Sequence, residues 1–388
     1  MKTQSRQAAG HLEQIMTIKL YRTIDKIFGS ILCAILGIFI RKKNITPDNI
    51  HTILIIKLWA VGESVLTLPM IDAIKKKYPH TKISILCRKR NAPVYESQSF
   101  INEIQHFEPN NLFKIAKLFK KYDLAIDCEP YLNLSAILGT YLAKKQLGFD
   151  HGIRAQLYNI RTHYNDQQHV VKTYLDLAKK IGIDADYKKL LPLKYAKEDM
   201  KFVDKLLAYN GITEKDIIIG ICQSVAETSK HRMWPRENYA KVADALAEKY
   251  KPKIILVGGN QEYNTQEQIQ QLCTYKESSI NLAGKTNLKQ LFTLLKRCAL
   301  FISNDTGPMH IAAAQGVKTI GIFGPNLPKR FAPYGKINIS LYAKQYCSPC
   351  INVHRGSFPE CYNAIKGKCL KEIPPEMVLE AAQKCLKK

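Results

Sequence analysis

Apolar residues along this chain fall into two series in which short buried-strand patterns alternate with helical ones. The first series opens with residues 52–58 (Thr-Ile-Leu-Ile-Ile-Lys-Leu), followed by a glycine turn, a helix through Lys77 and a strand at 82–87. The second series opens with residues 216–223 (Asp-Ile-Ile-Ile-Gly-Ile-Cys-Gln). Apolar runs of this length are typical of strands that are buried on both faces of a parallel sheet. The alternation predicts an α/β fold with two doubly wound, Rossmann-like parallel sheets.

The remaining elements follow from the same periodicities. Helices are expected at 112–121, 131–146, 164–180, 197–209, 236–250, 264–275, 287–297 and 308–315, and strands at 124–127, 253–257, 300–303 and 319–323. Residues 181–193, which hold Gly182 and Pro192, are predicted to link two domains. We therefore expect the active site in the cleft between the two domains, where the loops of both sheets meet.

An uncharged run precedes both series. Residues 27–40 carry no charged side chain, and they are flanked by Lys26 and by Arg41-Lys42-Lys43. A helix of this length spans about 21 Å, which is short of the roughly 30 Å hydrocarbon core of a bilayer. Two interpretations stay open: an interfacial anchor whose basic flanks meet anionic headgroups, or a helix packed on the protein itself. Because the run is apolar on every face, membrane contact is slightly favoured.

The composition indicates an anionic partner but does not identify it. The 388 residues include 58 Lys plus Arg against 33 Asp plus Glu, a formal charge of +25 that suggests an anionic partner. No zinc-finger spacing, basic heptad region or aromatic RNA-binding consensus accompanies this charge, so a nucleic-acid partner is not expected. The polar first 26 residues show no cleavable signal peptide, and seven of the eleven cysteines stand singly, as reduced core thiols do. A reducing, cytoplasmic compartment fits these features.

The stretch from Ser303 to Ala314 carries the clearest chemical signal. A buried strand ends at Ser303, Gly307 permits a close backbone approach, and Pro308 suits the first turn of a helix. The amide groups and the positive end of such a helix form an anion site, to which the Thr306 hydroxyl adds a donor and which His310 can face. The alternative is an ordinary helix cap at Asp305 or Thr306.

This stretch (Ser-Asn-Asp-Thr-Gly-Pro-Met-His-Ile-Ala-Ala-Ala), together with Gly-Ile-Phe-Gly-Pro at 321–325 and Pro-Tyr-Gly at 333–335, resembles the heptosyltransferase family, glycosyltransferase family nine. Residues 281–288 and 55–69 resemble the same family, in the same order along the chain. The resemblance implies a GT-B fold, two Rossmann-like domains that face a cleft. It also implies inverting, metal-independent transfer from a nucleotide-activated sugar, commonly ADP-heptose, to a lipopolysaccharide core, with no cofactor required. The last helix, at 375–387, is then expected to cross back onto the N-terminal domain.

The resemblance also assigns a general base, the group that takes the proton from the acceptor hydroxyl. The family has an aspartate after the glycine of the first loop, and this chain has Glu63 there, after Gly62. The side chain is one methylene longer, so the backbone has to adapt, since a misplacement of about 1 Å costs much rate. Glu63 can alternatively cap the following helix.

Donor-binding residues follow from the same resemblance. Without a metal, fixed cations and N–H donors must neutralise the leaving diphosphate. The family lysine before a Trp-Pro pair corresponds to Arg232 here, with Lys230 as a neighbour, and Thr306, Gly307 and His310 lie at the helix end. Further donor contacts are expected from Glu262 to ribose hydroxyls, from Thr286 and Leu282 to the base, and from Asp305 to sugar or ribose hydroxyls. Since Glu63 and Asp305 lie on loops of different domains, the domains are expected to close before these loops meet.

The C-terminal tail contains a separate group of cysteines. Cys347, Cys350, Cys361 and Cys369 have a spacing compatible with a structural zinc site, with His354 as an alternative ligand. The spacing does not match a common zinc ribbon, so disulfide-bonded or redox-sensitive cysteines and reduced packing thiols remain alternatives.

These features predict an extension at 1–45, an acceptor-binding domain at 46–185, a nucleotide-sugar-binding domain at 186–345 and a cysteine-rich tail with a helix at 346–388. The expected partners are a nucleotide sugar, a glycolipid acceptor and an anionic membrane, at the inner face of the cytoplasmic membrane. Two alternatives share the fold: a sugar-nucleotide epimerase and a non-catalytic sugar-nucleotide-binding protein. An oxidoreductase needs Gly-x-Gly-x-x-Gly after the first strand, and residues 58–69 contain only Gly62.

Overall fold

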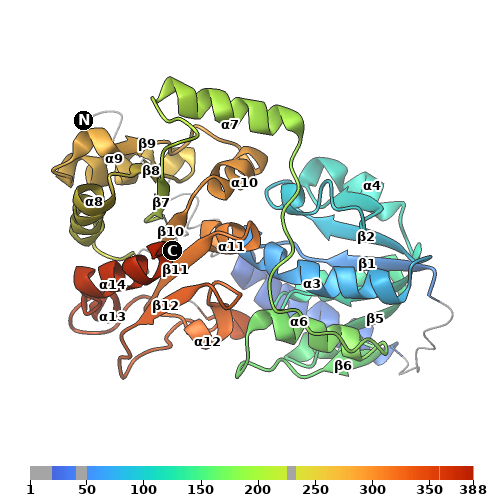
Figure 1. The fold of residues 1–388 in the computed structure, drawn as a ribbon. Coiled ribbons are helices and arrows are strands. Elements are labelled where there is room, and N and C mark those ends of the chain that lie inside the picture. The colour runs from blue at the N-terminus through green and yellow to red at the C-terminus, as the bar shows by residue number, and fades with distance from the viewer. Residues whose placement is uncertain (1–19, 41–49, 225–232, 358, 388) are drawn as a thin grey trace.

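The computed structural model describes residues 20–40, 50–224, 233–357 and 359–387. Within these residues the chain forms two six-stranded sheets, ordered β3-β2-β1-β4-β5-β6 and β12-β11-β10-β7-β8-β9, and every strand pair is parallel. The two sheets stand side by side with helices on both of their faces (Figure 1). The predicted α/β fold with two doubly wound parallel sheets is confirmed.

The first sheet is built around β1, whose alternate residues point to opposite helical layers. Ile53 and Ile55 pack with α3 (Val61–Lys77) and α6 (Val170–Lys179), whereas Leu54 and Ile56 pack with α4 (Leu112–Ala116) and α5 (Asn133–Leu142). This is the period-two pattern of a strand buried on both faces. The strands of this sheet are β1 (Thr52–Ile56), β2 (Lys82–Cys87), β3 (Glu103–His106), β4 (Tyr122–Asp127), β5 (Ala143–Phe149) and β6 (Ile160–Thr162).

The second sheet carries the C-terminal helices. Its strands are β7 (Ile218–Cys222), β8 (Lys253–Leu256), β9 (Ser279–Asn281), β10 (Leu300–Asn304), β11 (Lys318–Phe323) and β12 (Ile339–Tyr342). Its helices are α7 (Lys197–Tyr209), α8 (Arg236–Tyr250), α9 (Tyr263–Leu272), α10 (Leu288–Lys296), α11 (Gly307–Ala314), α12 (Pro328–Phe331), α13 (Lys368–Lys371) and α14 (Pro375–Leu386). Short 3₁₀ turns are η3 (Ala92–Val94), η4 (Pro109–Asn111), η5 (Ile153–Leu157), η7 (Asn260–Glu262), η8 (Lys276–Ser278) and η9 (Val353–Arg355).

Before β1, residues 20–38 are helical, with a π-helical turn η1 (Asp25–Gly29) leading into α2 (Ser30–Ile38). One side of α2 packs on the first domain through the buried Cys33, and the other side is exposed. The helix packs on the protein, as one of the two interpretations expected, and contact of its exposed side with a membrane stays a prediction. None of the helices in the described ranges has the length and hydropathy that crossing a bilayer would need.

Several local expectations were wrong. The helix expected at 131–146 ends at Leu142, and the chain continues directly as β5, which pairs with β4. Ala, Lys, Gln and Leu favour helices in isolation, but this preference is weak against the pairing available at the sheet. The short strands β3, β6, β9 and β12 were not predicted either. Helices α7 and α8 have the bounds that the periodicity predicts.

The last helix does not cross back to the N-terminal domain. Helix α14 buries Val378, Ala381, Ala382 and Cys385 in the core of the second domain, and Lys318 donates a hydrogen bond to the Cys385 carbonyl. The tail segment that reaches the first domain is instead the turn at η9, where His354 stacks on Tyr164 with 4.7 Å between ring centroids. The apolar side of α14 fits α8 and the second sheet, so its burial keeps it there.

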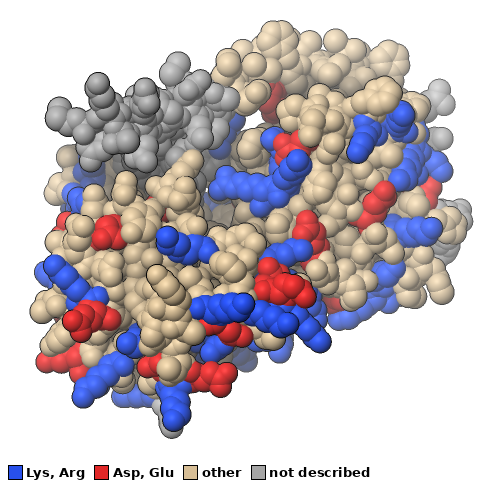
Figure 2. Space-filling model, turned by 90° about the horizontal axis from the view of Figure 1, so that it is seen from above, with Lys and Arg blue, Asp and Glu red and all other residues tan. Residues whose placement is uncertain are grey.

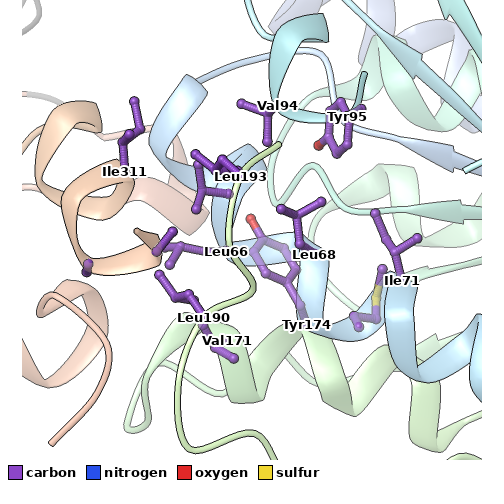
Figure 3. Close-up of a cluster of buried hydrophobic side chains, with 14 of the residues drawn as sticks. Leu66, Leu68, Ile71, Val94, Tyr95, Val171, Tyr174, Leu190, Leu193 and Ile311 are labelled. Carbon is purple, nitrogen blue, oxygen red and sulfur yellow. The ribbon is translucent and has the colours of Figure 1, made fainter. Parts of the chain in front are cut away.

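The two domains meet through apolar side chains at α3 and α11. Figure 3 shows Leu66 of α3 and Ile311 of α11 in one cluster with Leu190 and Leu193 of the connecting segment and Tyr174 of α6. All five are buried in a core that is continuous across the two domains. Gly62, next to Glu63, already contacts Gly307 at the start of α11 in this conformation, and domain closure during turnover stays a prediction.

Surface charge is dispersed on the face seen in Figure 2, where small groups of Lys and Arg alternate with Asp and Glu. This is the arrangement of a solvated surface of mixed charge.

Candidate active site

Glu63 lies in the first turn of α3, and a buried lysine holds its carboxylate. Lys57, at the end of β1, places its Nζ 2.6 Å from Glu63 Oε2 and 3.1 Å from Glu129 Oε2, and the Lys57 side chain is inaccessible to solvent. Burial by itself would lower the pKa of Lys57, but the charges of Glu129 and Glu63 outweigh burial and raise this pKa above its usual range. Tyr174 Oη donates to Glu63 Oε2 at 3.3 Å. Glu63 is therefore a fixed carboxylate with 15% of its side chain exposed, and its partners are not those of a helix cap.

The backbone around Glu63 is fixed from both sides. Glu129 Oε1 accepts hydrogen bonds from the amides of Leu58 and Trp59, at 2.7 and 2.8 Å. Asn91 Nδ2 donates to the Lys57 carbonyl at 3.0 Å. Ala60 adopts φ = 65°, a left-handed conformation that is costly for a residue with a side chain. This strained turn redirects the chain from β1 into α3.

The segment predicted to bind an anion is the start of α11. Thr306 is the N-cap residue, but its side chain makes no capping hydrogen bond. The Asp305 side chain is engaged elsewhere, since Asn326 Nδ2 donates to Asp305 Oδ2 at 2.9 Å. The helix starts with Pro308 in its first turn and has no side chain as a cap, so the ordinary-cap alternative is not supported. The amides at this end are suited to an anionic ligand.

Gly62 brings the two halves of the site into contact. A Cβ added at Gly62 would lie 2.8 Å from His310 Cδ2 and 3.2 Å from Gly307 Cα, so only glycine fits without a shift. Burial lowers the pKa of His310 to about 4, against an opposing effect of the Glu63 charge. His310 is therefore neutral near pH 7, and its Nδ1 is buried without a hydrogen-bond partner in the structure as described. The candidate base and the start of α11 thus form one site.

The loops after β8 and β9 leave the same carboxyl edge of the second sheet as the loop that leads into α11, because these strands are parallel. Gly284 N donates to the Gly258 carbonyl at 2.9 Å, which holds the loop of Leu282 and Thr286 against the loop of Glu262. The Glu262 carboxylate accepts from the amide of Gly259 within its own turn. Leu282 is buried and Thr286 is half-buried. Their roles toward the nucleoside remain predictions.

Arg232 and Lys230 lie outside the described residues. The Trp-Pro pair that follows them is fixed beside the site: the Trp234 amide donates to Asn304 Oδ1 at 3.3 Å, and Trp234 Nε1 donates to the Ile373 carbonyl at 2.8 Å. Asn304 immediately precedes Asp305.

The tail cysteines do not have the geometry of a zinc site. Across the described ranges, no three His, Cys, Asp or Glu side chains are placed to hold a metal ion. Cys369 packs in the second core, and His354, the alternative ligand, stacks on Tyr164. None of the eleven cysteines, all of which are described, is disulfide-bonded, and among the four tail cysteines only Cys369 is buried. The seven single cysteines are buried, as expected of core thiols: 33, 87, 128, 222, 273, 298 and 385.

Sequence reasoning missed Lys57, Glu129, Asn326 and Tyr174. For two of them a signal was present: Lys57 is a charge at the end of an apolar strand, and Glu129 follows the buried strand β4 by two residues. Charged residues at the carboxyl ends of parallel strands gather at one edge, which is where such sheets bind ligands.

The buried ring of His310 predicts acid sensitivity. In the unfolded chain this ring gains a proton below about pH 6.5, whereas in the folded protein its pKa is about 4. The stabilisation is complete above pH 6.5 and is lost as the pH falls toward 4. We expect His310 to lower the free energy of unfolding at pH 5 by about 1 to 2 kcal/mol relative to pH 7.5. Urea unfolding should show a weaker pH dependence for His310→Gln and an unchanged one for the exposed His80→Gln; equal slopes in all three proteins would contradict this.

The chain has two Rossmann-like sheets, and their loops meet at the Glu63 carboxylate and the start of α11. This arrangement is that of the GT-B class. A model of glycosyltransferase family 9 (heptosyltransferase) matches residues 114–357. Lipooligosaccharide heptosyltransferase 2 of Haemophilus ducreyi is 30% identical over 356 residues, which cover 86% of this chain and 99% of that protein. The chain belongs to glycosyltransferase family 9, the heptosyltransferase family, and it is a glycosyltransferase.

Solved structures agree on the fold. The family 9 glycosyltransferase of Veillonella parvula superposes with a TM-score of 0.74 at 23% identity, covering 89% of this chain and 99% of its own. Heptosyltransferase WaaC of Escherichia coli, solved with ADP, superposes with a TM-score of 0.65 at 19% identity, covering 86% and 99%. The family match does not favour the epimerase alternative.

Proposed function

We propose that this protein transfers a heptose from ADP-heptose to a lipopolysaccharide-core acceptor, with inversion at the anomeric carbon and without a metal ion. The contact between the Glu63 loop and the start of α11 is the observation that carries the proposal. The name of the H. ducreyi relative and the ADP in the WaaC structure support the choice of sugar and nucleotide.

In this mechanism Glu63 takes the proton from the acceptor hydroxyl as its oxygen attacks the anomeric carbon. The bond from that carbon to the donor phosphate breaks, and its electron pair goes to the β-phosphate oxygen of ADP. The amides of Thr306 and Gly307, with the side chains of Arg232 and Lys230, stabilise the charge that develops there. Glu262, Thr286 and Asp305 hold the nucleoside and the sugar hydroxyls.

Binding of ADP tests the donor half of the proposal. At 100 times its Kd, ADP should stabilise the protein by about 2.7 kcal/mol, measured as a rise in melting temperature that UDP and GDP do not match. EDTA should leave both this shift and sugar transfer unchanged. In crystals soaked with ADP, density for the diphosphate is expected at residues 306–308. Density elsewhere with that turn empty, or transfer that only added magnesium or manganese restores, would overturn the assignment.

We further propose that the enzyme acts at the inner face of the cytoplasmic membrane. A lipid-linked acceptor is confined to a membrane surface, and the exposed apolar side of α2 gives the enzyme a way to remain there.

A further inference from the structure

The outer helical layer of the first domain exposes apolar side chains over two regions that are separate in the sequence. The first region is the N-terminal helix, where ten large apolar side chains are 42–80% exposed: Leu20, Tyr21, Ile24, Ile27, Phe28, Ile31, Leu32, Ile35, Ile38 and Phe39. Contiguous patches of more than a few hundred Å² are uncommon on soluble monomers and mark interaction sites.

This helix is attached to the domain in a defined orientation. Asp25 caps α5 by accepting from the amides of Asn133 and Leu134, at 3.0 and 2.7 Å. Asn133 Nδ2 donates in return to the Asp25 carbonyl at 2.8 Å. A Cβ at Gly29 would lie 2.8 Å from the Asn133 side chain, which shows how closely the helix approaches α5. The exposed residues are therefore the outward side of a docked helix.

The second region continues the same layer across α5 to α4. Ile137 of α5 packs toward α2, and Leu138 packs toward the core beneath α4, so α5 lies between them. Tyr141 of α5 donates to the Ala116 carbonyl at 2.7 Å, and its ring lies 5.0 Å from that of Phe119. Five further large apolar side chains are exposed along this part: Leu112, Phe113, Phe119, Leu134 and Tyr141.

Positive charge accompanies these side chains. Lys114 and Lys117 are exposed on and after α4, and Lys117 Nζ lies 4.5 Å from the centre of the Phe113 ring. Arg22 and Lys26 belong to the N-terminal helix, and Arg41-Lys42-Lys43 follow it in the sequence. Apolar side chains mixed with lysines suit an anionic bilayer surface, where the lysines meet headgroups and the apolar groups enter the acyl boundary. A second copy of this face would place like charges against each other.

The face also lies close to the active site. Glu129, which shares the Lys57 Nζ with Glu63, lies four residues before Asn133, the first residue of α5 and the one that binds Asp25. One end of the face therefore adjoins the candidate base. We propose that η1, α2, α5 and α4 form one docking face for an anionic lipid bilayer, which presents the lipid-linked acceptor to Glu63. This proposal depends on the proposed function only in its choice of a lipid-linked acceptor; the binding of the face to a bilayer does not depend on it.

Vesicle co-sedimentation of the full chain tests this face. Wild-type protein should sediment with vesicles of phosphatidylcholine and phosphatidylglycerol, and less with phosphatidylcholine alone or in high salt. The triple variant Phe28→Ser/Ile38→Ser/Phe39→Ser and the α4 variant Phe113→Ser/Phe119→Ser should each weaken binding by about tenfold or more. The control Tyr209→Ser/Ile217→Ser removes exposed apolar groups from the second domain and should bind as wild type does.

Transfer to a water-soluble, delipidated acceptor separates the two proposals. Both face variants should retain wild-type turnover in that assay, so that a loss of vesicle binding cannot be attributed to misfolding. If the wild-type protein binds vesicles but transfers no sugar, the proposed function is wrong and the proposed docking face still holds. The proposed docking face would be wrong if the α4 variant bound vesicles as wild type does. It would also be wrong if sedimentation velocity showed that the variants dissociate a dimer while vesicle binding is unchanged.

Discussion

Glu63→Gln is expected to lower kcat by about 10²- to 10⁴-fold, because the amide cannot accept a proton from the acceptor hydroxyl. Binding of ADP should be unchanged within about twofold, since the diphosphate site lies at the start of α11. The substitution keeps the shape of the side chain, and Lys57 retains its pair with Glu129. Steady-state kinetics with calorimetric titration of ADP measure both quantities.

Two variants sharpen this test. Glu63→Asp keeps a carboxylate and has the family residue, so we expect at least tenfold more activity than for Glu63→Gln. The exposed Glu237→Gln should behave as wild type does. Wild-type turnover by Glu63→Gln would remove Glu63 as the base. A wild-type protein that binds ADP-heptose but never transfers would favour the non-catalytic alternative.

Removing Lys57 is expected to have the second largest effect, because Lys57, whose side chain is inaccessible to solvent, positions the Glu63 carboxylate. A displacement of about 1 Å in a reacting group can lower the rate by about 10²-fold. Lys57→Met alone would leave two carboxylates without their buried cation, at a cost of about 3 to 5 kcal/mol in stability. The double variant Lys57→Met/Glu129→Gln restores the charge balance, and the glutamine carbonyl can still accept from the amides of Leu58 and Trp59.

The double variant should fold, with kcat about 10²-fold lower and the KM for the donor little changed. Lys120→Met is the control, because the Lys120 Nζ also donates two hydrogen bonds, in its case to the backbone carbonyls of Thr140 and Ala143, outside the site. A folded double variant with wild-type kcat would show that Lys57 is only structural.

The sequence by itself determined the parts of this protein that depend on local pattern. Strands β1, β2, β7, β8, β10 and β11 are continuous apolar runs, and such runs are recognisable because both faces of a central parallel strand are buried. The start of α11 was also predictable, since Gly307 and Pro308 at the end of a buried strand specify a helix entry whatever lies around them. The two-sheet architecture and the position of the candidate anion site follow from these elements.

Only the tertiary structure decided what depends on contacts between distant residues. Lys57 and Glu129 are 72 residues apart, and no local pattern indicates that the carboxylates of Glu63 and Glu129 both bind Lys57. The strand β5 forms where local propensity favours a helix, because pairing with β4 contributes more than propensity does. Helix α14 stays on the second domain, and the N-terminal helix buries one side and exposes the other, because each apolar surface packs on whichever partner the fold places beside it.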